Sequence, residues 1–117
     1  MPTCNELIDL AVRHHKSGDL SQAEALYRQI LQAEPGHAAA LHLLGLLAHQ
    51  TGRHDMALGL IREAIALDPG AAVFHMNLGI VLKALGKAAE ATLCYRQALK
   101  LNPESVEALC NLGVALR

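Results

Sequence analysis

The chain has 117 residues, of which 52% are hydrophobic and 18% charged, and its formal net charge is −1. This composition favours a folded domain with an apolar core and excludes an intrinsically disordered chain. The balanced charge, with no stripe of lysine and arginine and few aromatic residues, argues against nucleic-acid binding.

Seven helices are predicted along the chain. Apolar residues recur at intervals of three and four, as Leu41, Leu44 and Ala48 do in the third helix. This spacing is typical of an amphipathic helix. The predicted helices span residues 4–17, 21–33, 38–51, 55–67, 72–85, 89–101 and 106–117.

Glycine and proline set the boundaries of these helices. A glycine separates the two helices of each pair, where its positive φ allows a tight turn. A proline follows each second helix and pushes the residue before it out of the helical region. These residues are Gly18, Gly52 and Gly86, and Pro35, Pro69 and Pro103. In the first unit, Ser21 and Glu24 form a capping box that is expected to start the second helix.

The landmark residues recur every 34 residues. A period between 20 and 50 residues indicates supersecondary units that stack, each covering the apolar face of the next. A further glycine recurs inside the first helix of each later unit. There a glycine destabilises the helix by about 1 kcal/mol relative to alanine, so its recurrence predicts that another helix approaches closely. The leucine landmarks are Leu10, Leu44, Leu78 and Leu112, and the glycines within the first helices are Gly45, Gly79 and Gly113.

Equivalent residues in successive units define the repeat. In the middle unit they are Leu41, Leu44, Gly45, Ala48, Ala57, Ile61 and Pro69. In the third unit they are His75, Leu78, Gly79, Leu82, Ala91, Tyr95 and Pro103. This pattern resembles the tetratricopeptide repeat. The resemblance implies an all-α, right-handed solenoid of antiparallel helix pairs, as one array over residues 1–117. Its repeats are expected at about 4–37, 38–71 and 72–105, with a partial repeat at 106–117.

Two short segments narrow the resemblance within the family. Residues 77–79 and 111–113, both Asn-Leu-Gly, look most like the repeats of O-linked N-acetylglucosamine transferases and their bacterial relatives. In those enzymes the repeats precede a catalytic domain. No nucleophile, base and orienting group recur together in this chain, so we expect no catalytic site in it and no enzyme activity.

The resemblance implies a concave wall, built by the first helices, that binds a peptide from a partner protein. The expected groove residues are mostly apolar, with scattered imidazoles and amides: Val12, His15, His42, Leu46, His49, Val73, Met76, Asn77, Ile80, Lys83, Asn111 and Val114. The family's clamp for a terminal carboxylate is not expected, because its positions carry no charge here. They hold Ile8, Val12, Leu43, Val73 and Asn77.

The polar residues of this wall leave alternatives open. Asn77 and Asn111 are equivalent, and they either bond the backbone of a bound peptide, as in the glycosyltransferase relatives, or pair locally. The seven histidines are either packed or solvated, or they make peptide affinity change between pH 5 and 7. His15, His42 and His49 are expected to lie too far apart to hold one ion, so no metal and no cofactor is predicted.

The last predicted helix, residues 106–117, has no following helix to cover it. Its apolar residues Leu109, Leu112 and Leu116 predict self-association. Three functions therefore stay open. The chain is a peptide-binding scaffold, the substrate-recruiting segment of a larger enzyme such as a glycosyltransferase, or a self-assembling module.

The cysteine pattern and the N-terminal residues bear on the cellular location of the protein. Cys4, Cys94 and Cys110 are odd in number and show no CxxC spacing, which argues against a disulfide framework or a zinc site. No signal sequence is evident, and no stretch reaches the roughly 18 uncharged apolar residues of a membrane span. We expect a cytoplasmic protein with a protein or peptide partner, and neither membrane nor nucleic acid as a partner.

Overall fold

The computed structural model describes residues 2–116, with the side chains of residues 2–113. This part of the chain forms seven α-helices and contains no strand. The helices are α1 (Cys4–Lys16), α2 (Leu20–Ala33), α3 (Ala38–Gln50), α4 (His54–Leu67), α5 (Ala72–Ala84), α6 (Ala88–Leu101) and α7 (Val106–Leu116). Within residues 2–116 each boundary lies within one residue of its predicted position, and the predicted end at 117 lies outside the described residues. The all-α prediction is confirmed.

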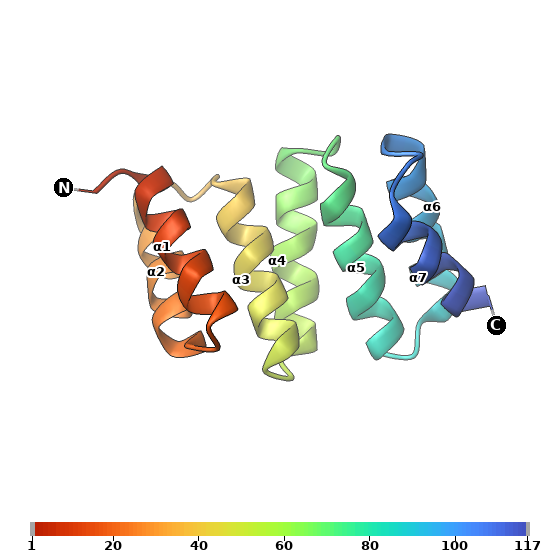
Figure 1. The fold of residues 1–117 in the computed structure, drawn as a ribbon, viewed down its shortest axis with the longest axis horizontal. Coiled ribbons are helices and arrows are strands. Elements are labelled where there is room, and N and C mark those ends of the chain that lie inside the picture. The colour runs from red at the N-terminus through yellow and green to blue at the C-terminus, as the bar shows by residue number, and fades with distance from the viewer. Residues whose placement is uncertain (1, 117) are drawn as a thin grey trace.

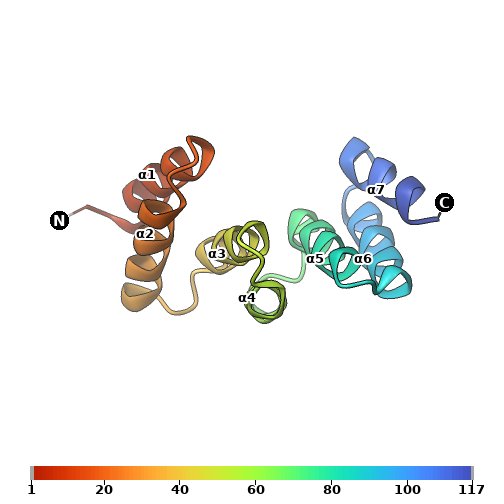
Figure 2. The same ribbon diagram turned by 90° about the horizontal axis from the view of Figure 1, so that it is seen from below.

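The helices pack as antiparallel pairs in two layers (Figure 1). One layer contains α1, α3, α5 and α7, and the other contains α2, α4 and α6. The stack measures 47 × 26 × 22 Å. Seen along its edge, it curves, with α1 and α7 raised at the two ends and α4 lowest (Figure 2). The layer of α1, α3, α5 and α7 therefore forms the concave face.

The turns within the pairs share one geometry. Their glycines have φ values of 87° at Gly18, 82° at Gly52 and 80° at Gly86, as predicted. In the first turn, the Asp19 N–H donates to the His14 carbonyl at 2.9 Å, and the Gly18 N–H donates to the His15 carbonyl at 3.2 Å. These two bonds make a Schellman motif, and equivalent bonds close the two other turns. Each pair therefore reverses direction in the same way.

The start of α2 corrects one prediction. The N-cap is Asp19, whose side chain accepts from the Gln22 N–H at 3.4 Å. Ser21 lies inside α2, so the capping box predicted from Ser21 and Glu24 is wrong. The reason is that the Schellman turn leaves Asp19 as the last non-helical residue, and an aspartate there caps the helix as well as a serine does.

The close packing predicted at three glycines within helices is confirmed at Gly45 and Gly79. It is wrong at Gly113, where nothing lies within 4 Å of an added Cβ. A Cβ atom added at Gly79 would lie 2.5 Å from Cε1 of the Tyr95 ring. A Cβ atom at Gly45 would lie 2.8 Å from Cγ1 of Ile61. The first helix of these pairs therefore packs its backbone directly against a buried side chain of the second.

Neighbouring repeats cover one another. Leu44 and Leu47 of α3 are almost fully buried, in a cluster with Tyr27 of the preceding pair. Leu10, which is equivalent to Leu44 but has no preceding pair against it, is 40% exposed. The core therefore extends from the first pair into the second, as expected of a repeat array.

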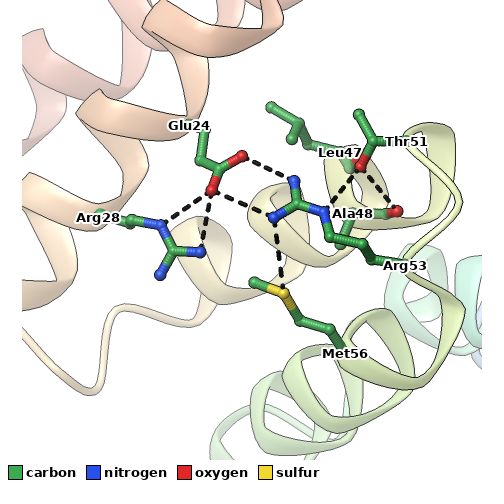
Figure 3. A network of polar contacts seen from close by, with 7 residues as sticks. All are labelled: Glu24, Arg28, Leu47, Ala48, Thr51, Arg53 and Met56. Carbon is green, nitrogen blue, oxygen red and sulfur yellow. Dashed lines mark hydrogen bonds and ion pairs between the residues drawn. The ribbon is translucent and has the colours of Figure 1, made fainter.

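A polar network also joins the first two repeats (Figure 3). Arg53, in the turn before α4, donates through Nη2 and Nη1 to the two carboxylate oxygens of Glu24, at 2.7 and 3.3 Å. Arg28 donates to the same carboxylate from one turn along α2, at 3.0 Å. The hydrogen bond from Arg53 is the main reason that the pKa of Glu24 is lowered, although partial burial opposes it.

Candidate functional site

The concave face contains two hollows. The first, between α1 and α3, has a volume of about 390 Å³, and the second, between α5 and α7, has about 490 Å³. The first is lined by Val12, His15, Lys16, Tyr27, Leu43, Leu46 and Gln50. The second is lined by His49, Ile80, Lys83, Ala84, Tyr95 and Asn111. Seven of the predicted groove residues are among them.

Hydrogen bonds fix the histidine of the first hollow. Nε2 of His15 lies 2.6 Å from Oε1 of Gln50, and Nδ1 lies 2.9 Å from the hydroxyl of Tyr27. Because an amide oxygen only accepts, Nε2 carries the proton, and Nδ1 accepts from the Tyr27 hydroxyl. Burial raises the pKa of Tyr27 to about 12, which keeps that hydroxyl a donor. His15 thus links α1, α2 and α3 at the edge of the hollow.

The second hollow combines an apolar wall with polar groups at its rim. Ile80 is half-buried, whereas Lys83 is exposed. Tyr95 forms part of its wall, although only 1% of that residue is exposed. Burial raises the pKa of Tyr95, so this ring also keeps its hydroxyl proton.

The structure places two predicted groove residues in the interior. His42 and Asn77 are each 6% exposed, and Nδ2 of Asn77 lies 2.5 Å from Nε2 of His42. The imidazole also packs on the Phe74 ring, with 4.6 Å between the ring centroids. Since an amide nitrogen only donates, Nε2 of His42 is unprotonated, and burial lowers its pKa to about 4. Asn77 is expected from the sequence either to bond a bound peptide or to pair locally, and in this structure it pairs locally with His42. Asn111 instead lines the second hollow.

The remaining histidines also have polar partners close by. Nδ1 of His49 lies 3.0 Å from Nδ1 of His54 across the α3–α4 turn. The pKa of His49 is lowered, mainly by burial and further by the charge of His54. The other partners are Asp19 for His14, the Ala40 N–H for His37 and the Pro69 carbonyl for His75. Each of these histidines therefore has a polar partner within the protein.

The other predicted residues lie apart from the two hollows. Val73 is 45% exposed and Met76 is buried, and both line a smaller hollow of about 180 Å³ beside α7. For self-association, Leu109 is 52% exposed, whereas Leu112 packs against the core. The side chains of Val114 and Leu116 lie outside the described residues.

Sequence reasoning missed the two tyrosines among the groove residues. Tyr27 and Tyr95 occupy the same repeat position, which holds Ile61 in the middle unit. The repeat pattern accounts for Tyr95 as a core landmark, and it does not predict that either tyrosine lines the groove. Their hydroxyl groups are the signal that could have identified them, because a buried tyrosine hydroxyl needs a polar partner or a polar cavity.

Neither a metal site nor a membrane-spanning helix is found among the described residues. Among the residues that the structure describes, no three His, Cys, Asp or Glu side chains are arranged to hold a metal ion. No helix within the described range 2–116 has the length and apolarity needed to cross a bilayer.

Comparison with known proteins identifies the repeat. Residues 8–72 match a family model described as tetratricopeptide repeat, and residues 81–116 match one described as TPR repeat. An O-GlcNAc transferase mutant from Thermobaculum terrenum is 39% identical over 99% of this chain, with a TM-score of 0.95. The chain spans 23% of the length of that transferase chain. No curated protein matches the sequence.

Two more distant structures share the fold. The first TPR of Spaghetti (RPAP3), bound to the HSP90 peptide SRMEEVD, is 21% identical, with a TM-score of 0.91. The match covers 97% of this chain and 90% of that one. The Sgt2 TPR domain from Aspergillus fumigatus is 19% identical, with a TM-score of 0.92, over 100% of this chain and 79% of that one.

Proposed function

The chain belongs to the tetratricopeptide repeat family, and from that premise we propose that it is a protein–protein interaction module whose concave face binds a peptide segment of a partner. The observation that carries the proposal is the pair of hollows on that face. Each joins aliphatic side chains to a few polar groups, which is the usual chemistry of a binding site. The peptide bound to the TPR of Spaghetti (RPAP3) supports this function by analogy of fold.

The test compares the concave face with the outer layer. Phage that display random 12-residue peptides are selected on the unmodified protein, and the selected peptides are measured against three variants. Leu46→Glu and Ile80→Glu each place a charge in a hollow, whereas Leu93→Glu makes the same kind of change on α6, where Leu93 is 68% exposed. Circular dichroism confirms that all three variants fold.

We expect the two hollow variants to lose peptide affinity by at least about tenfold, because a charge replaces an apolar contact worth 1.5–3 kcal/mol. Leu93→Glu should bind as the unmodified protein does. The proposal is wrong if no peptide is selected, or if Leu93→Glu reduces affinity as much as the other two.

A second candidate is that the chain recruits substrates for a larger glycosyltransferase. The observation that favours it is the 39% identity with the O-GlcNAc transferase mutant along almost the whole chain. Sequencing the coding region that flanks these 117 codons tests this function. A transferase domain beside the repeats would support it, and its absence on both sides would contradict it.

A third candidate is self-assembly through α7, and the observation that favours it is the exposure of Val106 (70%) and Leu109 (52%). Light scattering coupled to gel filtration measures the mass of the protein and of Leu109→Glu over a range of concentrations. Self-assembly predicts a mass above 12.5 kDa that Leu109→Glu reduces. A monomer at every concentration would rule it out.

A further inference from the structure

The two hollows are lined by residues at equivalent repeat positions. Five residues of the first have equivalents in the second, each 68 residues later, which is two repeat lengths. The pairs are Val12 and Ile80, His15 and Lys83, Lys16 and Ala84, Tyr27 and Tyr95, and Leu43 and Asn111. The concave face therefore presents the same kind of subsite twice.

The middle repeat differs from its neighbours at two of these positions. Its residue equivalent to the tyrosines is Ile61, which is fully buried and has no hydroxyl group. Its equivalent of His15 is His49, which lies within hydrogen-bonding distance of His54 across the turn. The middle repeat thus contributes residues to both subsites but differs from its neighbours at the tyrosine position.

The subsites share apolar walls and a positive charge. Val12 and Leu46 line the first and Ile80 lines the second, and all three are half-buried. Each subsite contains one lysine, Lys16 or Lys83, and both lysines are exposed. Among the described residues that line the two subsites, none is a carboxylate. A complementary ligand is therefore apolar where it enters the hollow and negative beside it.

The distance between the subsites limits the ligand further. α1 and α5 are separated by α3 in the concave layer, and both end at the same edge of the stack (Figure 1). At the usual helix spacing of 8–10 Å, two helix steps correspond to a separation of about 16–20 Å. An extended peptide rises about 3.3 Å per residue, so about six residues span this distance.

We propose that the partner segment is an extended acidic peptide with two large apolar side chains about six residues apart. Each apolar side chain enters one hollow, and a neighbouring aspartate or glutamate pairs with Lys16 or Lys83. This inference rests on the proposed function and specifies its ligand.

The test uses three synthetic 12-residue peptides built on a glycine and serine background. The matched peptide has leucines at positions 3 and 9, each followed by glutamate. The second has the same composition with its leucines three residues apart, and the third has lysine in place of both glutamates. Isothermal titration measures each peptide against the unmodified protein, Lys16→Glu/Lys83→Glu and the control Arg62→Glu/Lys100→Glu, which changes the same net charge.

We expect the matched peptide to bind at least about tenfold more tightly than the second, because wrong spacing leaves one leucine outside its hollow. The lysine peptide should bind the unmodified protein more weakly, by roughly threefold for each lost ion pair. Lys16→Glu/Lys83→Glu should reverse this preference, and Arg62→Glu/Lys100→Glu should keep it. Equal affinity for both spacings, or an unchanged charge preference in Lys16→Glu/Lys83→Glu, would overturn the inference.

The phage selection distinguishes a failure of this ligand inference from a failure of the proposed peptide-binding function. If selected peptides bind the concave face but lack the two apolar residues and the acidic neighbours, the ligand inference fails and the interaction function stands. If no peptide is selected and none of the synthetic peptides binds, both fail.

Discussion

The pair of His42 and Asn77 couples the stability of the fold to pH. The imidazole is neutral when it accepts the amide hydrogen bond, and burial lowers its pKa from 6.5 to about 4. The unfolded chain therefore binds a proton at a higher pH than the folded chain does. The contribution of His42 to stability is complete above pH 6.5 and is lost as the pH falls from 6.5 towards 4.

We predict that this loss reaches about 2–3 kcal/mol by pH 4, from the usual value of about 1.4 kcal/mol per pKa unit. Urea unfolding at several pH values between 7 and 4 measures it, with His42→Gln as the control. Glutamine keeps an amide partner for Asn77 but does not titrate, so the stability of this variant should depend less on pH over that range. Identical pH profiles for the two proteins would disprove the coupling.

Gly79 and Gly59 form a matched pair of glycines within helices. The first packs against the Tyr95 ring, whereas nothing lies within 4 Å of a Cβ added at the second. We predict that Gly79→Ala destabilises the fold by about 1–3 kcal/mol, because the buried ring cannot move aside. Gly59→Ala should stabilise it by up to about 1 kcal/mol, because alanine favours the helix. Thermal unfolding distinguishes them, and a stable Gly79→Ala variant would contradict the close packing.

At the scale of elements, the link between the first two repeats combines apolar packing with the Glu24 network. Arg53 makes two hydrogen bonds to Glu24 across 29 residues of sequence, but both side chains are partly exposed. Such a pair adds little stability, and salt screens it. Its contribution is therefore expected to be small and to depend on ionic strength.

A double-mutant cycle tests this link. Glu24→Gln and Arg53→Gln, alone and together, should show a small favourable coupling at low ionic strength that disappears in 1 M salt. The i,i+4 pair of Glu24 and Arg28 serves as the comparison within one helix. A coupling that is absent at low salt, or that persists unchanged at high salt, would contradict an electrostatic link.

The elements were predictable from the sequence because the signals that define them are local. Helix periodicity and the turn glycines predicted each boundary in the described part of the chain to within one residue. The cap of α2 was not predicted, because Asp19 and Ser21 are both good caps and only the turn geometry decides between them. The pairing of His42 with Asn77 joins α3 to α5 across 35 residues, and no sequence pattern specifies such a contact.

At the scale of the whole molecule, repetition builds both the fold and the candidate site. The 34-residue period stacks the pairs, and their curvature gathers one side of α1, α3, α5 and α7 into a concave face (Figure 2). Substitutions at single repeat positions then differentiate that face. Tyrosines in the first and third units line two similar hollows, whereas the middle unit holds Ile61 at that position.

The most direct test of peptide binding by the concave face is methyl NMR of the protein during titration with the matched double-leucine peptide. The account predicts that the methyl signals of Val12, Leu46 and Ile80 shift and saturate together, while those of Leu93 on α6 stay in place. Shifts that centre on Leu93, or no shifts with this peptide and with every phage-selected peptide, would contradict it.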